Sequence, residues 1–121
     1  MNWRYFQFHE FTCQCGCRGN DIDASFVDKL DELRQAVGFP FIITSGYRCP
    51  DHNEKVSSTQ SRTGPHTTGR AVDILASHAN AVELVAVGYR MGFKGFGVNQ
   101  KGEGRIIHLD DARPHLKMWS Y

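Results

Sequence analysis

The segment Gly95-Phe96-Gly97-Val98-Asn99-Gln100-Lys101-Gly102-Glu103-Gly104-Arg105-Ile106-Ile107-His108-Leu109-Asp110 decides the fold, because it predicts two strands joined by a turn. The runs on either side of Gln100–Gly104 are strand-like, and the glycines between them are typical of a β-hairpin. Alternate side chains of a strand share a face. His108 and Asp110 are therefore expected on one face of the second strand, about 6–7 Å apart along it.

Apolar periodicity and turn residues predict the other elements. Phe26, Leu30, Leu33 and Val37 follow one another at helical spacing, Asp23 and Ser25 are candidate N-caps, and Gly38 ends the helix. We further predict a buried strand over 41–44, a short helix over 49–56, a long loop over 57–69, a strand over 71–75, a helix over 78–92 and an edge strand within 117–121.

These elements favour one α+β domain over residues 1–121, with a small antiparallel-rich sheet and helices packed on it. Residues 1–20 are aromatic and cysteine-rich, and we expect them to wrap around the domain. The sequence has no internal repeat and no obvious linker, so a second domain is not predicted.

Composition narrows the functional classes. The chain has 121 residues, 40% of them hydrophobic and 22% charged, which argues against disorder. The formal net charge of +1 does not favour nucleic acid or an anionic membrane as a partner. No apolar stretch approaches the roughly 20 residues needed to span a bilayer, and the N-terminus has no signal-peptide core. We expect a soluble monomer made in the cytoplasm, although no sequence feature addresses its oligomeric state.

Three residues suggest a metal site: His66, Asp73 and His108. Two imidazoles and a carboxylate, with one position left open, form a ligand set that zinc uses for hydrolysis. An aspartate between the apolar residues of a strand goes against β propensity and burial preference, and such a violation often marks a functional site. Either histidine alone would more commonly be a solvated loop residue or a hydrogen-bonded core residue.

Four other histidines compete for the ligand positions: His9, His52, His78 and His115. His9 and His78 are predicted to lie at the surface or at a helix start. His115 is the strongest rival, but Pro114 interrupts the strand before it, so we expect His115 to face solvent.

Three motifs together resemble the zinc D-Ala-D-Ala carboxypeptidase family: Ser45–Asn53 (SGYRCPDHN), His66–Asp73 (HTTGRAVD) and Ile107–Asp110 (IHLD). This family includes bacterial peptidoglycan carboxypeptidases and phage endolysin peptidases, and it shares a core with lysostaphin-type enzymes and hedgehog domains. The resemblance extends from about residue 11 to residue 121 and implies the same hedgehog-like and peptidase-like fold.

The resemblance also implies roles for individual residues. His66, Asp73 and His108 resemble the ligands of one catalytic zinc ion, and Arg48 resembles the arginine that binds substrate and stabilises the oxyanion. Asp110 resembles the general base. We also expect Tyr47 to contact substrate, and Phe96, Trp119 and Tyr121 are further aromatic candidates for the groove. Ser45 and Asn53 are predicted to be structural.

Two positions depart from the family pattern. Many relatives carry an acidic residue shortly before the last histidine, where this chain has Gly102-Glu103-Gly104-Arg105. Glu103 would lie on the face of an ideal strand opposite to His108, so we prefer Asp110 as the base, with Glu103, His115 and His52 as the next candidates. Gly64 stands where relatives often have serine.

The cysteines leave several alternatives open. Cys13, Cys15 and Cys17 alternate, and Cys49 follows later. On an extended segment the first three would share one side. Four thiols could bind a structural zinc ion, although ligand pairs are usually spaced C-x2-C or wider. A Cys17–Cys49 disulfide and free, partly buried thiols are the other interpretations.

We therefore expect a zinc-dependent peptidase that cleaves next to a D-amino acid in peptidoglycan stem peptides or crosslinks, as a carboxypeptidase or an endopeptidase. Such an enzyme, of phage or prophage type, would reach the cell wall after holin release or as a virion component. The alternative is a non-catalytic, zinc-containing module of the same fold that binds the cell wall or a protein.

Overall fold

In the computed structural model, which describes residues 3–121, five strands form one sheet in the order β1-β2-β4-β3-β5. Neighbouring strands are antiparallel except β3 and β5, which are parallel. The α+β fold with an antiparallel-rich sheet is therefore confirmed. The strands are β1 (Ile43–Ser45), β2 (Ala71–Leu75), β3 (Gly95–Asn99), β4 (Ile106–Asp110) and β5 (Lys117–Ser120).

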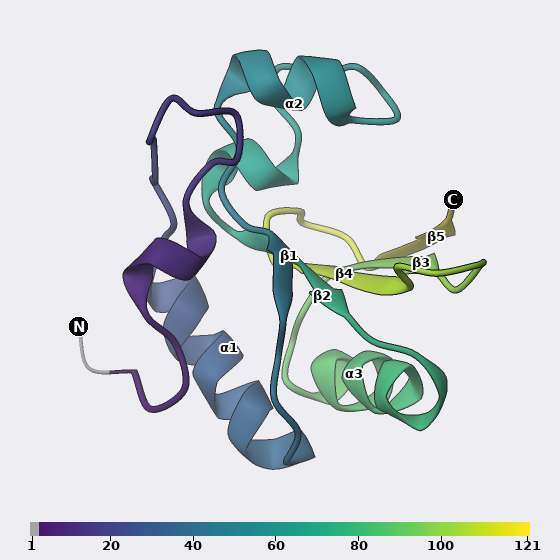
Figure 1. The fold of residues 1–121 in the computed structure, drawn as a ribbon. Helices are drawn as coiled ribbons and strands as arrows, with labels where there is room; N and C mark the ends of the chain where they lie inside the picture. The colour runs from purple at the N-terminus through teal and green to yellow at the C-terminus, as the bar shows by residue number, and fades with distance from the viewer. Residues whose placement is uncertain (1–2) are drawn as a thin grey trace.

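Helices lie on both sides of this sheet. Helix α1 (Ala24–Val37) and helix α3 (His78–Arg90) lie below it and pack on one another, whereas α2 (Pro50–Val56) lies above it (Figure 1). Two 3₁₀ helices, η1 (Phe8–Phe11) and η2 (Pro65–Thr68), complete the elements of the described chain. The lower side therefore holds the core, and the upper side is left for the site.

The predicted boundaries of α1 are confirmed by its caps. The carboxylate of Asp23 accepts hydrogen bonds from the backbone N–H groups of Ser25 and Phe26, which satisfies donors that the first helical turn leaves unpaired. Gly38 ends the helix with a left-handed φ of 80°. Phe26, Leu30 and Leu33 of the predicted apolar face are fully buried, and Val37 at its end is partly buried.

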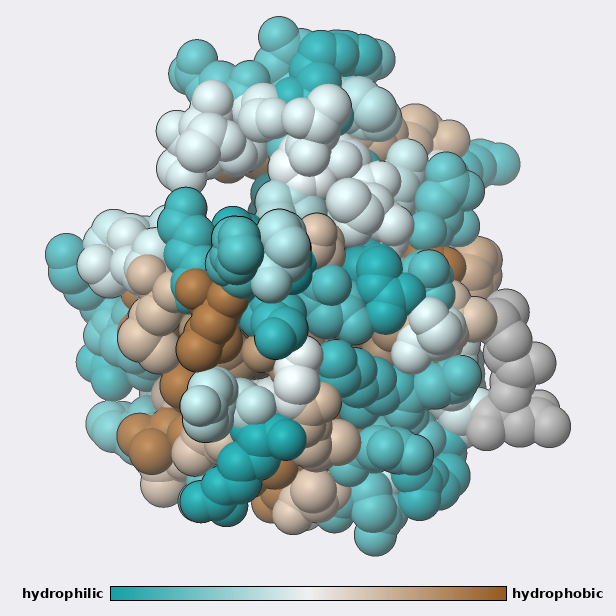
Figure 2. Space-filling model, turned by 180° about the vertical axis from the view of Figure 1, so that it is seen from behind, coloured by the Kyte–Doolittle hydropathy of each residue, from teal (hydrophilic) through white to brown (hydrophobic). Residues whose placement is uncertain are grey.

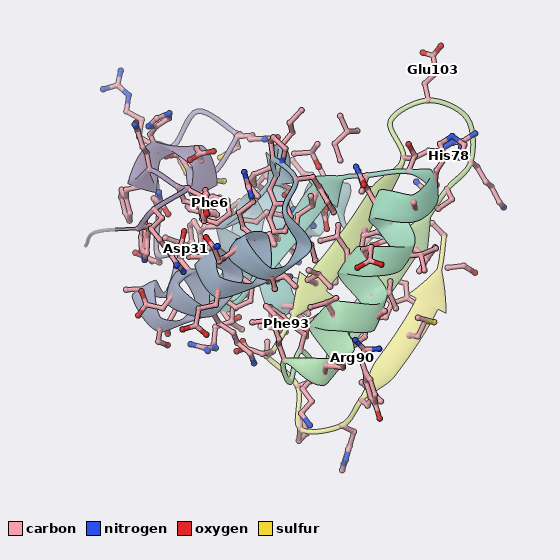
Figure 3. The ribbon with its side chains drawn as sticks, turned by 90° about the horizontal axis from the view of Figure 1, so that it is seen from below. Phe6, Asp31, His78, Arg90, Phe93 and Glu103 are labelled. Carbon is pink, nitrogen blue, oxygen red and sulfur yellow. The ribbon has the colours of Figure 1, made fainter. Side chains whose placement is uncertain are left out.

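Aromatic residues close the core at the ends of the helices. Phe93, just after α3, lies between α1 and α3 and meets Phe26 edge-on at a ring-centroid distance of 5.9 Å (Figure 3). From the N-terminal segment, Phe6 and Phe11 are buried, and Phe6 packs against Phe41 at 6.1 Å. Phe6 and Phe11 therefore join the core from the segment predicted to wrap around the domain, of which residues 1–2 lie outside the described part.

The pairing of β2 with β4 matters most for function. Asp73 stands directly opposite His108 in the register of this pair, and Gly97 of β3 flanks His108 on its other side. Side chains at directly opposed positions have Cβ atoms about 4.5–5.5 Å apart. Two of the three predicted metal ligands are therefore brought together by the sheet itself.

The remaining differences from the sequence prediction are small. The first strand covers 43–45 rather than 41–44, α2 begins at Pro50, and the predicted loop 57–69 contains the turn η2. The tail forms the expected edge strand, β5. No helix within residues 3–121 is long and apolar enough to cross a membrane.

Replacing Gly69, at the end of η2, should destabilise the fold more than an equivalent change at Gly38. Both glycines have a left-handed φ, 77° and 80°. An added Cβ at position 38 meets nothing within 4 Å, whereas at position 69 it would lie 2.1 Å from the backbone oxygen of Asp21. Gly38→Ala should cost about 1–2 kcal/mol, and Gly69→Ala about 1–3 kcal/mol more, through overlap. Urea unfolding curves would measure both, and equal losses would contradict the predicted overlap.

Candidate metal and catalytic site

Three predicted ligands meet on the upper side of the sheet. His66 comes from η2, Asp73 from β2 and His108 from β4, and all three are buried. Asp73 Oδ1 lies 3.3 Å from His66 Nε2 and 3.0 Å from His108 Nδ1, and one ligand atom from each residue lies within 4.8 Å of the others. Ligand atoms around a tetrahedral zinc ion with bonds near 2.0–2.1 Å stand about 3.3 Å apart, so this spacing fits such an ion.

The other nitrogen of each imidazole is already held by the protein. His66 Nδ1 lies 2.8 Å from the carbonyl oxygen of Gly46, and His108 Nε2 lies 2.6 Å from Asp110 Oδ2. Because each of these acceptors requires an N–H donor, the lone pairs of the neutral rings are on His66 Nε2 and His108 Nδ1. Both lone pairs therefore face Asp73, as metal ligation requires.

Electrostatics keep the central carboxylate ionised. Without a metal ion, burial by itself would raise the pKa of Asp73, but hydrogen bonds and positive charge from His108 and His66 in their protonated forms hold that pKa well below its usual range. Burial by itself would lower the pKa of His108, and its contacts with Asp110 and Asp73 raise it instead. An ionised carboxylate in a buried position with two imidazoles is a strong site for a divalent cation.

Arg48 reaches the same site from the loop before α2. Its Nη2 lies 3.4 Å from Asp73 Oδ2, its Nη1 donates to Asn53 Oδ1 at 3.1 Å, and its Nε donates to Ser45 Oγ at 3.0 Å. The guanidinium is thus held on three sides beside the ligands. Arg48 therefore lies beside the predicted ligands, and its catalytic role stays a prediction.

The contacts of Asn53 show which structural role this side chain has. It is 1% exposed, and besides accepting from Arg48 it donates through Nδ2 to the carbonyl oxygen of Ser61. A Cβ at Gly64 would lie 2.9 Å from that Nδ2, which gives a steric reason for glycine at this departure from the family pattern. The predicted structural role of Asn53 and Ser45 therefore consists of orienting Arg48.

Asp110 requires a correction. It shares a face with His108, as strand alternation predicted, but it lies at the Nε2 edge of the ring, whereas the Nδ1 edge faces Asp73. Its side chain is fully buried, and both oxygens accept hydrogen bonds from Arg113. Burial would raise the pKa of Asp110, but His108 and Arg113 lower it. This geometry suits a residue that orients His108, and it does not suit the predicted general base.

The sequence analysis missed several residues that surround His108. Arg113 packs over the ring of Trp119 at 4.6 Å, and that ring lies 5.0 Å from the imidazole of His108. Two glycines of β3 make the room: a Cβ at Gly95 would lie 2.1 Å from Asp110 Oδ2, and one at Gly97 would lie 2.9 Å from Trp119. A Gly-x-Gly pattern within a strand was the available signal, because glycine in a strand often marks a close approach.

A pocket of about 410 Å³ opens above the ligands. Seen from behind, the lobe of α2 at the top is covered by hydrophilic and neutral residues, and a notch separates it from the body of the molecule (Figure 2). Trp119 and Tyr121 line the pocket as expected. Tyr47 and Phe96 do not line it, because Phe96 belongs to the core and Tyr47 is buried beside Gly19. The expected contact of Tyr47 with substrate is therefore not supported.

The rival residues lie away from this site. His9, His78 and His115 are exposed, and half-buried His52 on α2 does not line the pocket. Glu103 projects from the tip of the β3–β4 hairpin and is exposed (Figure 3).

The four cysteines also converge, at a separate place. Ligand atoms of Cys13, Cys15, Cys17 and Cys49 all lie within 4.8 Å of one another, and the four thiols are free. Burial by itself would raise the pKa of Cys13, but hydrogen bonds from Cys49 and Cys15 lower it to about 7. No Cys17–Cys49 disulfide is formed.

Two buried histidines and an aspartate, in a pocket with a fixed arginine, are the side chains expected at the site of a metal-dependent hydrolase. Comparison with known families makes this specific: the family described as Peptidase M15 matches residues 4–110. The chain belongs to the Peptidase M15 family and is a metallopeptidase of a family of zinc enzymes. A search of curated proteins found no match.

Replacing Asp110 with asparagine tests its corrected position. If Asp110 orients His108, Asp110→Asn should weaken zinc affinity about 10–100-fold, and excess zinc should restore much of the activity. Zinc titration against a competing chelator, with turnover measured at each zinc concentration, would show this. Normal zinc affinity with activity lost at saturating zinc would instead restore Asp110 as the base.

Proposed function

We propose that this chain is a zinc-dependent peptidase that hydrolyses peptide bonds next to D-amino acids in bacterial peptidoglycan. The observation that carries the proposal is the convergence of His66 Nε2, Asp73 Oδ1 and His108 Nδ1 at the base of the pocket. Membership of the Peptidase M15 family supports the metallopeptidase activity, and the chemistry of the pocket and the sequence motifs support the proposed substrate.

The three ligands leave room for a fourth group on the pocket side. A zinc ion held there would act as a Lewis acid and lower the pKa of a bound water to about 7. The protein's own contribution is the fixed orientation of both rings, which Gly46 and Asp110 provide, and the exclusion of bulk water from the buried ligands.

Arg48 is placed to interact with the carbonyl group of a substrate. Its guanidinium lines the pocket and already lies 3.4 Å from Asp73 Oδ2. A permanently charged group that is held by Asn53 and Ser45 can donate to a developing oxyanion without reorganising during the reaction. We therefore assign Arg48 to oxyanion stabilisation and substrate binding.

The charge of the pocket favours a substrate that bears a carboxylate. Arg48, Arg113 and Lys117 line it, whereas Asp73 is its only acidic side chain within residues 3–121. Peptidoglycan stem peptides end in such a group, and a terminal carboxylate next to the scissile bond suits a D-Ala-D-Ala carboxypeptidase. Cleavage of a crosslink by the same residues is the endopeptidase form of this proposal. The motifs shared with phage endolysin peptidases support a phage or prophage origin.

One observation favours a second candidate, a non-catalytic zinc module that binds the cell wall. With Asp110 at the far edge of His108, the pocket has no acidic side chain within residues 3–121 beyond the ligand Asp73. A peptidase of this design would depend on the acidity of bound water and on Arg48. The two candidates differ in whether any peptide product is released.

Purified peptidoglycan should release D-alanine or shortened stem peptides when it is incubated with the zinc-loaded protein. Chelation with phenanthroline should abolish release, and His66→Ala should do the same because it removes a ligand. Mass spectrometry of the products would distinguish a carboxypeptidase from an endopeptidase. Binding without release from any wall type would favour the non-catalytic module, and release that persists under chelation would contradict the zinc mechanism.

Arg48→Ala should retain zinc and fold but lower kcat about 10²–10³-fold, the usual cost of losing one oxyanion donor. Arg62→Ala is the matched control, because Arg62 is exposed, pairs with Asp51 and Glu54, and does not line the pocket. Steady-state kinetics on a defined stem peptide would measure both variants. Equal kinetics would remove Arg48 from the mechanism.

A further inference from the structure

We propose that Cys13, Cys15, Cys17 and Cys49 bind a second zinc ion, which fastens the N-terminal segment to the loop that carries Arg48. This site lies outside the peptidase pocket and goes beyond the proposed function. None of the four cysteines lines that pocket.

The spacing of the sulfur atoms is that of a metal cage. Cys15 Sγ lies 3.5 Å from Cys13 Sγ and 3.6 Å from Cys49 Sγ, and all four sulfurs lie within 4.8 Å of one another. Zinc–sulfur bonds of about 2.3 Å in a tetrahedron place the sulfurs about 3.8 Å apart. The thiols therefore already stand near the positions that a tetrahedral four-cysteine site requires.

Backbone N–H groups point at three of these sulfurs. The N–H of Cys49 donates to Cys13 Sγ at 3.3 Å, that of Gly19 to Cys17 Sγ at 3.3 Å, and that of His52 to Cys49 Sγ at 3.4 Å. Such donors stabilise negative charge on sulfur, and zinc binds the thiolate form. The backbone is thus arranged for four thiolates that share one cation.

The unusual C-x-C-x-C spacing has a local explanation. Residues 14–17 form a turn rather than the extended segment that the alternation suggested, with left-handed φ values of 90° at Gly16 and 62° at Arg18. The turn curls the chain around the sulfurs, so cysteines two residues apart can occupy neighbouring corners of one tetrahedron. The C-x-C-x-C spacing, which is shorter than that of usual zinc ligand pairs, is therefore compatible with a four-cysteine zinc site.

Paired disulfides explain the arrangement less well. Cys15 is almost equally close to Cys13 and Cys49, yet it could bond to only one of them. Each disulfide also needs an S–S distance near 2.05 Å, well below the 3.5 and 3.6 Å between Cys15 and its two neighbours, so pairing would require the sulfurs to move. A single four-coordinate ion uses all four side chains.

The expected consequence concerns Arg48. Cys49 follows it directly and caps α2, and the carbonyl oxygen of Cys49 accepts from the N–H of Asn53 at 3.0 Å. Asn53 in turn holds Arg48. An ion bound to Cys49 and to the 13–17 turn would fix this loop, so that its loss should loosen the arginine without touching the catalytic ligands.

Metal analysis of the full chain tests the proposal. Wild type purified under reducing conditions should contain about two zinc ions per chain, and His66→Ala, which empties the peptidase site, should retain about one. X-ray absorption at the zinc edge of His66→Ala should show only sulfur neighbours, at about 2.3 Å. About one zinc ion in wild type and none in His66→Ala would overturn the proposal, as would nitrogen and oxygen neighbours alone or a Cys15–Cys49 disulfide found by mass spectrometry.

The double variant Cys15→Ser/Cys17→Ser provides the complementary test. It should keep about one zinc ion, bound at His66, and its kcat should fall while the catalytic zinc affinity stays unchanged. Gln14→Ala is the matched control, because it alters the same turn and leaves all four sulfurs. The proposal is wrong if the double variant binds as much zinc as this control. Failure of the peptidase assay would leave the zinc count untouched, so the two proposals fail separately.

Discussion

The direct opposition of Asp73 and His108 across β2 and β4 is the constraint on which the site depends. Every other part of the site is placed relative to this pair, since His66 reaches it from η2 and Arg48 from the loop before α2. A slip of one residue in the register would turn one of the two side chains into the core. The apolar neighbours of Asp73, Val72 and Ile74, prevent that slip because both are fully buried.

The surroundings of His108 show how the fold accommodates buried charge. An isolated carboxylate in the interior is costly, and pairing offsets this cost only when hydrogen bonds satisfy both partners. Asp110 meets this condition through His108 and the two-pronged contact of Arg113, which Trp119 covers from the other side. Glycine at position 95 makes this arrangement possible, because any Cβ there would displace the carboxylate of Asp110.

The sequence predicted the elements and the three ligands well, because periodicity, caps and a strand aspartate each have a local cause. The sequence prediction failed where a role depended on which side-chain atoms are in contact, and not only on which face of a strand a residue occupies. Alternation placed Asp110 beside His108, yet it could not say which ring nitrogen the carboxylate would meet. Tyr47 adjoins Arg48 in sequence, but neighbouring side chains in an extended loop point apart, and its ring is buried on the other side. The turn at 14–17 is followed by Arg18, whose left-handed φ of 62° no sequence pattern predicted.

The segment 45–53 links the His66, Asp73 and His108 cluster to the four cysteines. This double role explains why so many residues of the SGYRCPDHN motif have specific contacts. The carbonyl oxygen of Gly46 orients His66, the next side chain but one is Arg48, and Cys49 then turns to the sulfurs. Nearby residues of one segment thus contact His66, Asp73 and the N-terminal turn. A segment with contacts on both sides has little freedom to relax, so a change at either cluster should be felt at Arg48. The carbonyl oxygen of Phe11, which accepts from the N–H of Tyr47 at 2.9 Å, adds a backbone tie to the same loop. The N-terminal segment is therefore tied to the loop that carries Arg48, although none of its described side chains lines the pocket.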